Sequence, residues 1–107
     1  MKNLVLFFAF FITSVSFSQS IRFDGYIQDQ QKNPLEMANV MAVNNATKAM
    51  DSYGITNDKG KFQLSLKPNA SYVIKISYLG MQSKEITIST KSENMTQNIV
   101  MDDAGIE

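Results

Sequence analysis

The chain has 107 residues, with ten basic and ten acidic side chains, so its formal net charge at pH 7 is zero. The charges are scattered without a run of one sign, so the sequence predicts binding neither to nucleic acid nor to an anionic membrane surface. Cysteine and histidine are both absent, which excludes a cysteine nucleophile, a histidine base and an ordinary zinc site. We therefore expect no catalytic residue, metal or cofactor, and the length allows one domain at most.

The N-terminus has the pattern of a secretory signal peptide. Lys2 provides a positive charge, and nine consecutive apolar residues follow shortly after it. Ser16 and Ser18 then stand two apart, which is the small-residue pattern that signal peptidase accepts. We predict that residues 1–18 are removed and that Gln19 becomes the first residue. The apolar run is too short for a spanning helix, which needs about 20 residues, so we expect no transmembrane span in this chain.

Most of the remaining chain alternates between apolar and polar residues with period two, which is typical of half-buried β-strands. The predicted strands cover residues 21–28, 61–66, 72–78, 84–89 and 97–101. The residues predicted to face inward are Ile21, Phe23, Gly25 and Ile27 in the first strand, Phe62, Leu64 and Leu66 in the second, Tyr72, Ile74, Ile76 and Tyr78 in the third, and Ile86 and Ile88 in the fourth. Tyr26 falls on the outward face of the first strand.

One stretch, residues 34–50, supports two interpretations. It is rich in alanine and methionine, and Pro34 could occupy the first position of a helix. Two adjacent asparagines and a weak helical period argue against that helix. Val40 and its neighbours fit a short buried strand equally well, so the pattern alone leaves helix and strand open.

Two glycines mark predicted changes of direction. Residues 57–60 are expected to form a turn in which Gly60 takes a positive φ, as a bulged hairpin requires. Gly80 is expected to bend the chain after Tyr78, because glycine interrupts strands at bulges and tight bends.

Three segments, taken in order, resemble the carboxypeptidase regulatory-like domain. The residues that carry the resemblance are Gly25, Pro34, Ala38 and Val40 in the first segment, Thr56, Asn57, Gly60 and Phe62 in the second, and Tyr78 and Gly80 in the third. The resemblance spans about residues 21–101. Two departures are Met37, where the family usually has glycine, and Met81, where it usually has an aromatic residue.

The resemblance implies an all-β fold, a transthyretin-like (prealbumin-like or Ig-like) sandwich of about seven strands over residues 19–101. It favours a strand over residues 38–45. Residues 102–107 would then be a tail, similar to the stretch that precedes a plug domain in outer-membrane receptors.

The family context also implies a location and partners. In Gram-negative bacteria of the Bacteroidetes type, such a domain commonly follows the signal peptide of a TonB-dependent outer-membrane receptor. We therefore expect a non-catalytic accessory domain in the periplasm or at the outer membrane. Its partners would be proteins, either periplasmic or outer-membrane components or its own plug and barrel. The alternative is a free-standing secreted or cell-surface binding module.

Other functional interpretations of particular residues are weaker. Residues 57–60 lack the alternating oxygen ligands of a calcium loop. Asp102 and Asp103 are adjacent, so in an extended tail their side chains point in opposite directions and cannot form a catalytic pair. Tyr26 on an outward face and Tyr53, expected in a loop, are the best candidates for surface contacts with a partner.

Overall fold

The computed structural model describes residues 20–103, and these form eight β-strands. The strands are β1 (Ile21–Gln28), β2 (Asn39–Asn44), β3 (Met50–Ile55), β4 (Lys61–Leu66), β5 (Ser71–Ser77), β6 (Lys84–Ser89), β7 (Met95–Thr96) and β8 (Ile99–Val100). Within this described part of the chain there is no helix long and apolar enough to cross a membrane. The predicted signal peptide, residues 1–18, and residues 104–107 of the predicted tail lie outside the described residues.

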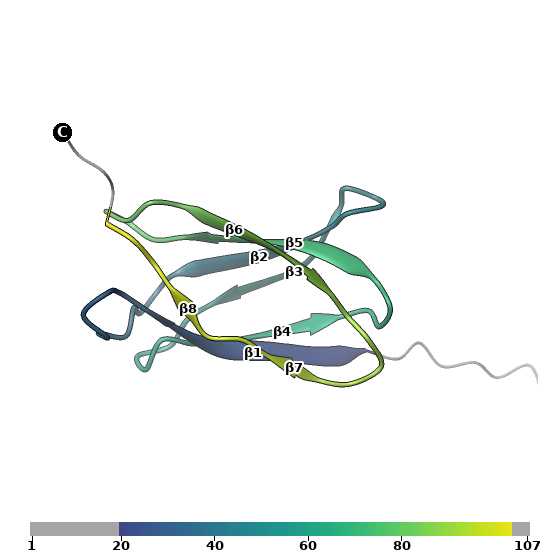
Figure 1. Ribbon diagram of the computed structural model, residues 1–107, viewed down its shortest axis with the longest axis horizontal. Coiled ribbons are helices and arrows are strands. Elements are labelled where there is room, and N and C mark those ends of the chain that lie inside the picture. The colour runs from purple at the N-terminus through teal and green to yellow at the C-terminus, as the bar shows by residue number, and fades with distance from the viewer. Residues whose placement is uncertain (1–19, 104–107) are drawn as a thin grey trace, which may run out of the picture.

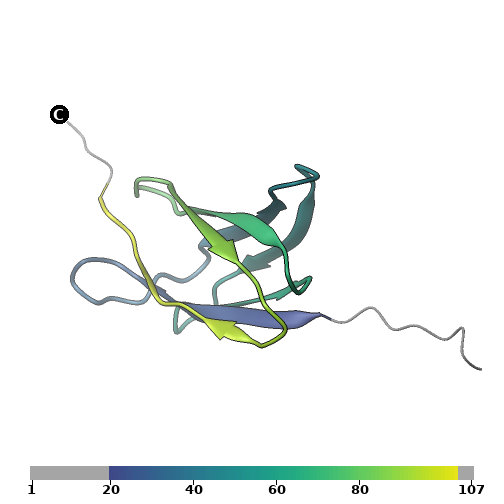
Figure 2. The same cartoon turned by 45° about the vertical axis from the view of Figure 1, so that its right-hand side comes forward.

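The strands form two layers, which Figures 1 and 2 show from two sides. One sheet has the order β4-β1-β7, with β8 also paired to β1, and the other has the order β3-β2-β5-β6. The predicted all-β sandwich is therefore confirmed. Of the last predicted strand, residues 97–101, only Ile99–Val100 is a strand, β8. The short β7 precedes that range, and both strands pair in parallel with β1.

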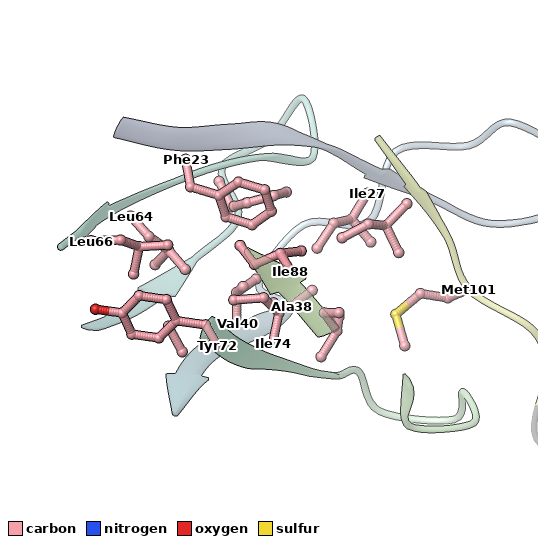
Figure 3. Packing of buried hydrophobic residues seen from close by; sticks show 14 of the residues in the cluster. Phe23, Ile27, Ala38, Val40, Leu64, Leu66, Tyr72, Ile74, Ile88 and Met101 are labelled. Atoms are coloured by element: carbon pink, nitrogen blue, oxygen red, sulfur yellow. The ribbon is translucent and has the colours of Figure 1, made fainter. Parts of the chain in front are cut away.

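The core lies between the two sheets, and Figure 3 shows its side chains meeting there. Phe23 of β1 and Phe62 of β4 pack with their ring centroids 5.4 Å apart. The predicted inward residues of β1 and β4 are buried, and so are Tyr72, Ile74 and Ile76 of β5. Tyr78, which follows β5, and Ile86 of β6 are only partly buried. Burying a large apolar side chain contributes about 1.5–3 kcal/mol, so the two inward faces hold the layers together without any disulfide.

The ambiguous stretch contains strand rather than helix. β2 lies between β3 and β5 and pairs with both, and Val40 and Ala42 point into the core. Lys48, which has φ 64°, lies in the turn that reverses the chain after β2. Ladder hydrogen bonds on both sides of β2 therefore decide the conformation, and local propensity does not.

The turn at residues 57–60 exists, but the expected hairpin is wrong. Gly60 has φ 77°, as predicted. β3 and β4, however, belong to different sheets and do not pair, so this turn carries the chain from one layer to the other. Gly80 has φ 83° in a tight turn, in which the N–H of Met81 donates to the carbonyl of Tyr78 at 3.0 Å.

Gly25 is the point where the last part of the chain crosses β1 most closely. A Cβ at this position would lie 1.9 Å from the carbonyl oxygen of Gln97. The N–H of Gln97 donates to the carbonyl of Asp24 at 2.9 Å. The N–H of Tyr26 donates to the side chain of Asn98 at 3.0 Å. These bonds hold the segment between β7 and β8 against β1, and only glycine leaves room for it.

We expect Gly25→Ala to lower the free energy of unfolding by about 3 kcal/mol or more, because the segment around Gln97 must move away from β1. Gly80→Ala is the matched control. No atom lies within 4 Å of a Cβ at residue 80, so that variant should lose only the about 1–2 kcal/mol that a positive φ costs. Urea denaturation of both variants measures the difference. Equal losses would contradict the role assigned to the crossing.

Candidate functional site

The two tyrosines predicted as surface contacts lie on opposite faces of the molecule. Tyr26 is on the outer face of β1 and is 45% exposed, and Tyr53 is 50% exposed. The Tyr26 ring has the ammonium of Lys61 5.9 Å from its centroid, and its other neighbours on that face are polar. The structure therefore does not bring the two tyrosines into one site.

Tyr53 lies in β3 and not in a loop, so that part of the prediction is wrong. Its neighbours Met50 and Ile55 are 56% and 47% exposed. These three side chains share the outer face of β3, and we call them the β3 stripe. Met41 of β2 lies opposite Tyr53 in the pairing register and extends the apolar surface onto the next strand. Sequence reasoning missed Met50 and Ile55, although the alternation of Tyr53 and Ile55 was a signal for a strand.

Two local features fix the β3 stripe. The register between β2 and β3 shifts after Ala42, and Met50 comes to lie opposite Val43 on the outer face. The hydroxyl of Tyr53 donates to the side-chain oxygen of Asn39 at 2.7 Å, which orients the ring. The exposed apolar side chains therefore lie on an ordered strand rather than on a mobile loop.

The ten motif residues that carry the family resemblance do not converge on a pocket. Ala38, Val40 and Phe62 are core residues. Asn57 accepts hydrogen bonds from the backbone N–H groups of Lys59 and Lys61 at 2.9 and 3.0 Å and so closes its turn. The motif residues therefore build the core and the connections of the sandwich.

Thr56 is the most constrained of these motif residues. Its side chain is buried, accepts from the N–H of Ala38 at 2.8 Å and donates to the carbonyl of Leu35 at 2.5 Å. Its backbone N–H donates to the carbonyl of Ala38 at 3.0 Å. Thr56 thus ties the loop before β2 to the end of β3.

A second polar cluster lies where β3, β5 and the β4–β5 loop meet. The hydroxyl of Tyr72 donates to the carboxylate of Asp51 at 2.9 Å and accepts from the N–H of Lys67 at 3.1 Å. The ammonium of Lys67 lies 3.8 Å from the same carboxylate. Burial and the neighbouring Asp51 raise the pKa of the Tyr72 hydroxyl above its ordinary value. Buried hydroxyl groups normally have hydrogen-bond partners. The position of Tyr72 in the fold therefore explains both its hydrogen bonds and its raised pKa.

The described residues contain no cluster of three or more acidic, histidine or cysteine side chains that could hold a metal ion. A shallow depression lies on the outer face of the second sheet, lined in part by Met41, Lys75 and Glu85. It adjoins the β3 stripe through Met41. The feature that this surface offers is therefore the exposed apolar β3 stripe along one strand of the sheet.

The two packed sheets, with motif residues that serve the fold, define a β-sandwich module. The model of the CarboxypepD_reg-like domain family matches residues 23–107, which is most of the chain. The chain therefore belongs to the CarboxypepD_reg-like domain family, whose members are non-catalytic β-sandwich modules. No curated protein matches the sequence.

Solved structures with the same fold come from proteins of different kinds. The Bacillus anthracis TIE protein matches with a TM-score of 0.66 and 15% identity, over 79% of this chain and 17% of that one. Catechol 1,2-dioxygenase from Pseudomonas arvilla C-1 matches with a TM-score of 0.65 and 10% identity, over 87% and 55% of the two chains. The shaft pilin SpaA from Lactobacillus rhamnosus GG matches with a TM-score of 0.61 and 13% identity, over 83% and 48%.

This chain therefore spans less than two thirds of each of these proteins. At such identities the likeness concerns the fold alone.

We expect Thr56→Val to lower the free energy of unfolding by about 1–3 kcal/mol, because it leaves the buried N–H of Ala38 and the carbonyl of Leu35 without a partner. Thr56→Ser keeps the hydroxyl and is the matched control, with a smaller loss. Urea denaturation measures both variants. Equal stability of the valine variant and the original chain would show that the hydroxyl contributes nothing.

The raised pKa of Tyr72 predicts that the free energy of unfolding depends on pH at alkaline pH. The unfolded chain loses this proton near the ordinary tyrosine pKa of about 10, whereas the folded chain holds it to higher pH. The contribution to stability is therefore complete below that pH and is lost as the pH rises through the raised pKa.

Unfolding free energies measured between about pH 8 and pH 11 should fall more steeply for the original chain than for Tyr72→Phe. Tyr26→Phe, which changes a half-exposed tyrosine, should leave the original slope unchanged. A Tyr72→Phe slope equal to that of the original chain would contradict the prediction.

Proposed function

We propose that this chain is a non-catalytic interaction domain that works in the periplasm, at the N-terminus of a TonB-dependent outer-membrane receptor for nutrient uptake. The observation that carries the interaction role is the β3 stripe. Met50, Tyr53 and Ile55 are each about half exposed on one face of an ordered strand. Exposed apolar patches of this kind mark contacts with other proteins, so we take the β3 stripe as the contact surface for a receptor or periplasmic component.

Two further features support a module placed between other segments. Figures 1 and 2 show β1 beginning at one end of the sandwich and the chain leaving β8 toward the other. Segments joined at residues 20 and 103 would thus be held on opposite sides. Close to the exit, the N–H of Gln82 donates to the carbonyl of Asp102 at 2.9 Å, so the chain is attached to the sandwich up to that point.

The second candidate function is a free-standing secreted or cell-surface binding module. It uses the same β3 stripe and needs no plug or barrel. Both functions need export, and the apolar N-terminus with its Ser16–Ser18 pattern supports that. Catalysis has no support in either, because histidine and cysteine are missing from the sequence.

The DNA sequence downstream of codon 107 distinguishes the two proposed functions. If the chain belongs to a receptor, the reading frame should continue into a plug domain and then into strands of about ten residues with alternating apolar and polar side chains. A stop codon directly after Glu107 would exclude the receptor and favour the free-standing module. Mass spectrometry of the exported protein should also find Gln19 at its N-terminus. A protein that retains residues 1–18 and remains in the cytoplasm would contradict both proposed functions.

The contact surface is tested by photo-crosslinking in cells. A photoreactive phenylalanine in place of Tyr53 should form a crosslink to the plug or barrel of the same polypeptide, or to a periplasmic protein, as mass spectrometry identifies. The same group in place of Tyr26 is the matched control, since Tyr26 is exposed to a similar extent, 45% against 50%, on the opposite sheet. Equal crosslinking at both positions, or none at either, would overturn the role of the β3 stripe.

A further inference from the structure

β6 is a six-residue strand at the edge of its sheet, and no described strand pairs with its outer side. β3 and β4 approach one another at the opposite side, where the N–H of Ser65 donates to the hydroxyl of Ser52 at 3.3 Å. β7 and β8 have two residues each. β6 has six residues and pairs with β5 alone among the described strands. Figure 1 shows it at the margin of its sheet.

An open strand edge presents backbone N–H and carbonyl groups on every second residue, and these groups pair readily with another extended chain. Proteins usually block such an edge with charges, proline or a bulge. Here the charged residues stand together at the start of the strand. The ammonium of Lys84 donates to the carbonyl of Val100 at 2.8 Å, and Glu85 follows. The rest of the edge, residues 86–89, carries no charge.

The order of residues along β6 is complementary to itself in the antiparallel direction. If Thr87 lies opposite Thr87 of a second copy, Ile86 comes to lie opposite Ile88 of that copy, and Glu85 opposite Ser89. Lys84 lies opposite Thr90. Apolar residues then meet across the pair, and no like charges are opposed, which is the pairing that stabilises neighbouring strands.

We propose that two copies of this chain associate through β6, antiparallel and around a two-fold axis at Thr87, to form one continuous sheet from the two four-stranded sheets. This contact is isologous, so it closes with two copies and does not propagate. Strand addition of this length buries less than the about 1,200 Å² of a standard interface, so the dimer is weak and reversible.

The dimer has a consequence for the proposed contact surface. A two-fold axis perpendicular to the sheet keeps the outer faces of both copies on the same side. The dimer then carries two β3 stripes, each three strands away from β6 in the order β3-β2-β5-β6. Two linked weak contacts bind more tightly than either alone.

A single introduced cysteine tests the pairing, because the sequence has no cysteine of its own. At the two-fold axis, residues 87 of the two copies have Cα atoms about 4.5–5.5 Å apart, within the range that a disulfide bridges. The full chain with Thr87→Cys should therefore form a covalent dimer under mild oxidation. Glu85→Cys is the matched control on the same face of β6, and its two cysteines would lie about 13 Å apart.

The register is tested by mixing variants. Glu85→Cys and Ser89→Cys should each stay monomeric alone but crosslink when mixed, since these positions lie opposite one another across the axis. Gln63→Cys, on the exposed outer face of β4, gives the rate of random collision. Crosslinking of Thr87→Cys no faster than Gln63→Cys would overturn the dimer, and crosslinking only in mixtures of Thr87→Cys with Glu85→Cys would overturn the register.

A cysteine-free measurement gives an independent result. Thr87→Lys places two ammonium groups opposite one another at the axis, so it should weaken self-association by at least about tenfold. Gln63→Lys adds the same charge away from β6 and should leave self-association unchanged. Sedimentation velocity over a range of concentrations measures both, and circular dichroism confirms that each variant is folded. Monomeric behaviour of the original chain up to millimolar concentration would overturn the proposal.

Discussion

The close crossing of residues 97 and 98 over Gly25 is the constraint on which the rest of this sandwich depends. It allows β1 to pair with β4 on one side and with both β7 and β8 on the other. Ile99 of β8 and Met101, which follows β8, thereby cover one flank of the core, and both are buried. Without this crossing, β1 would have an open edge, and the core would lose the side chains that close it.

The connections between the layers are held by side chains that replace missing ladder bonds. Thr56 joins the loop before β2 to β3. At the other end of the sandwich Thr90 has the same role, since its hydroxyl accepts from the N–H of Ala70 at 2.9 Å and donates to the carbonyl of Lys67 at 2.6 Å. Buried threonine hydroxyls with two partners are stabilising, because backbone groups in a turn would otherwise be left unpaired. The motif residues of the family thus serve folding, and the surface is left free for contacts.

The β3 stripe and the β6 edge lie on the same sheet of the described sandwich. The β3 stripe is an apolar face, whereas β6 is a backbone edge, and β2 and β5 separate them. An apolar face has little directional preference, so it contributes affinity. A strand edge demands an extended partner in a defined register, so it contributes orientation. A module without catalytic residues can organise other proteins by combining these two kinds of contact.

The sequence by itself determined the strand periodicity, the inward faces of β1, β4 and β5, the turn glycines and the family, because these depend on local alternation and on backbone conformation at single residues. It did not determine β2, whose alanines and methionines also suit a helix, or β3, whose Asp51, Ser52 and Gly54 are poor strand formers. Only pairing with β5 and β2 made these segments strands. The same pairing placed Tyr53 beside Met50 and Ile55 and left β6 uncovered, because a strand's exposed face and free edge depend on its neighbours.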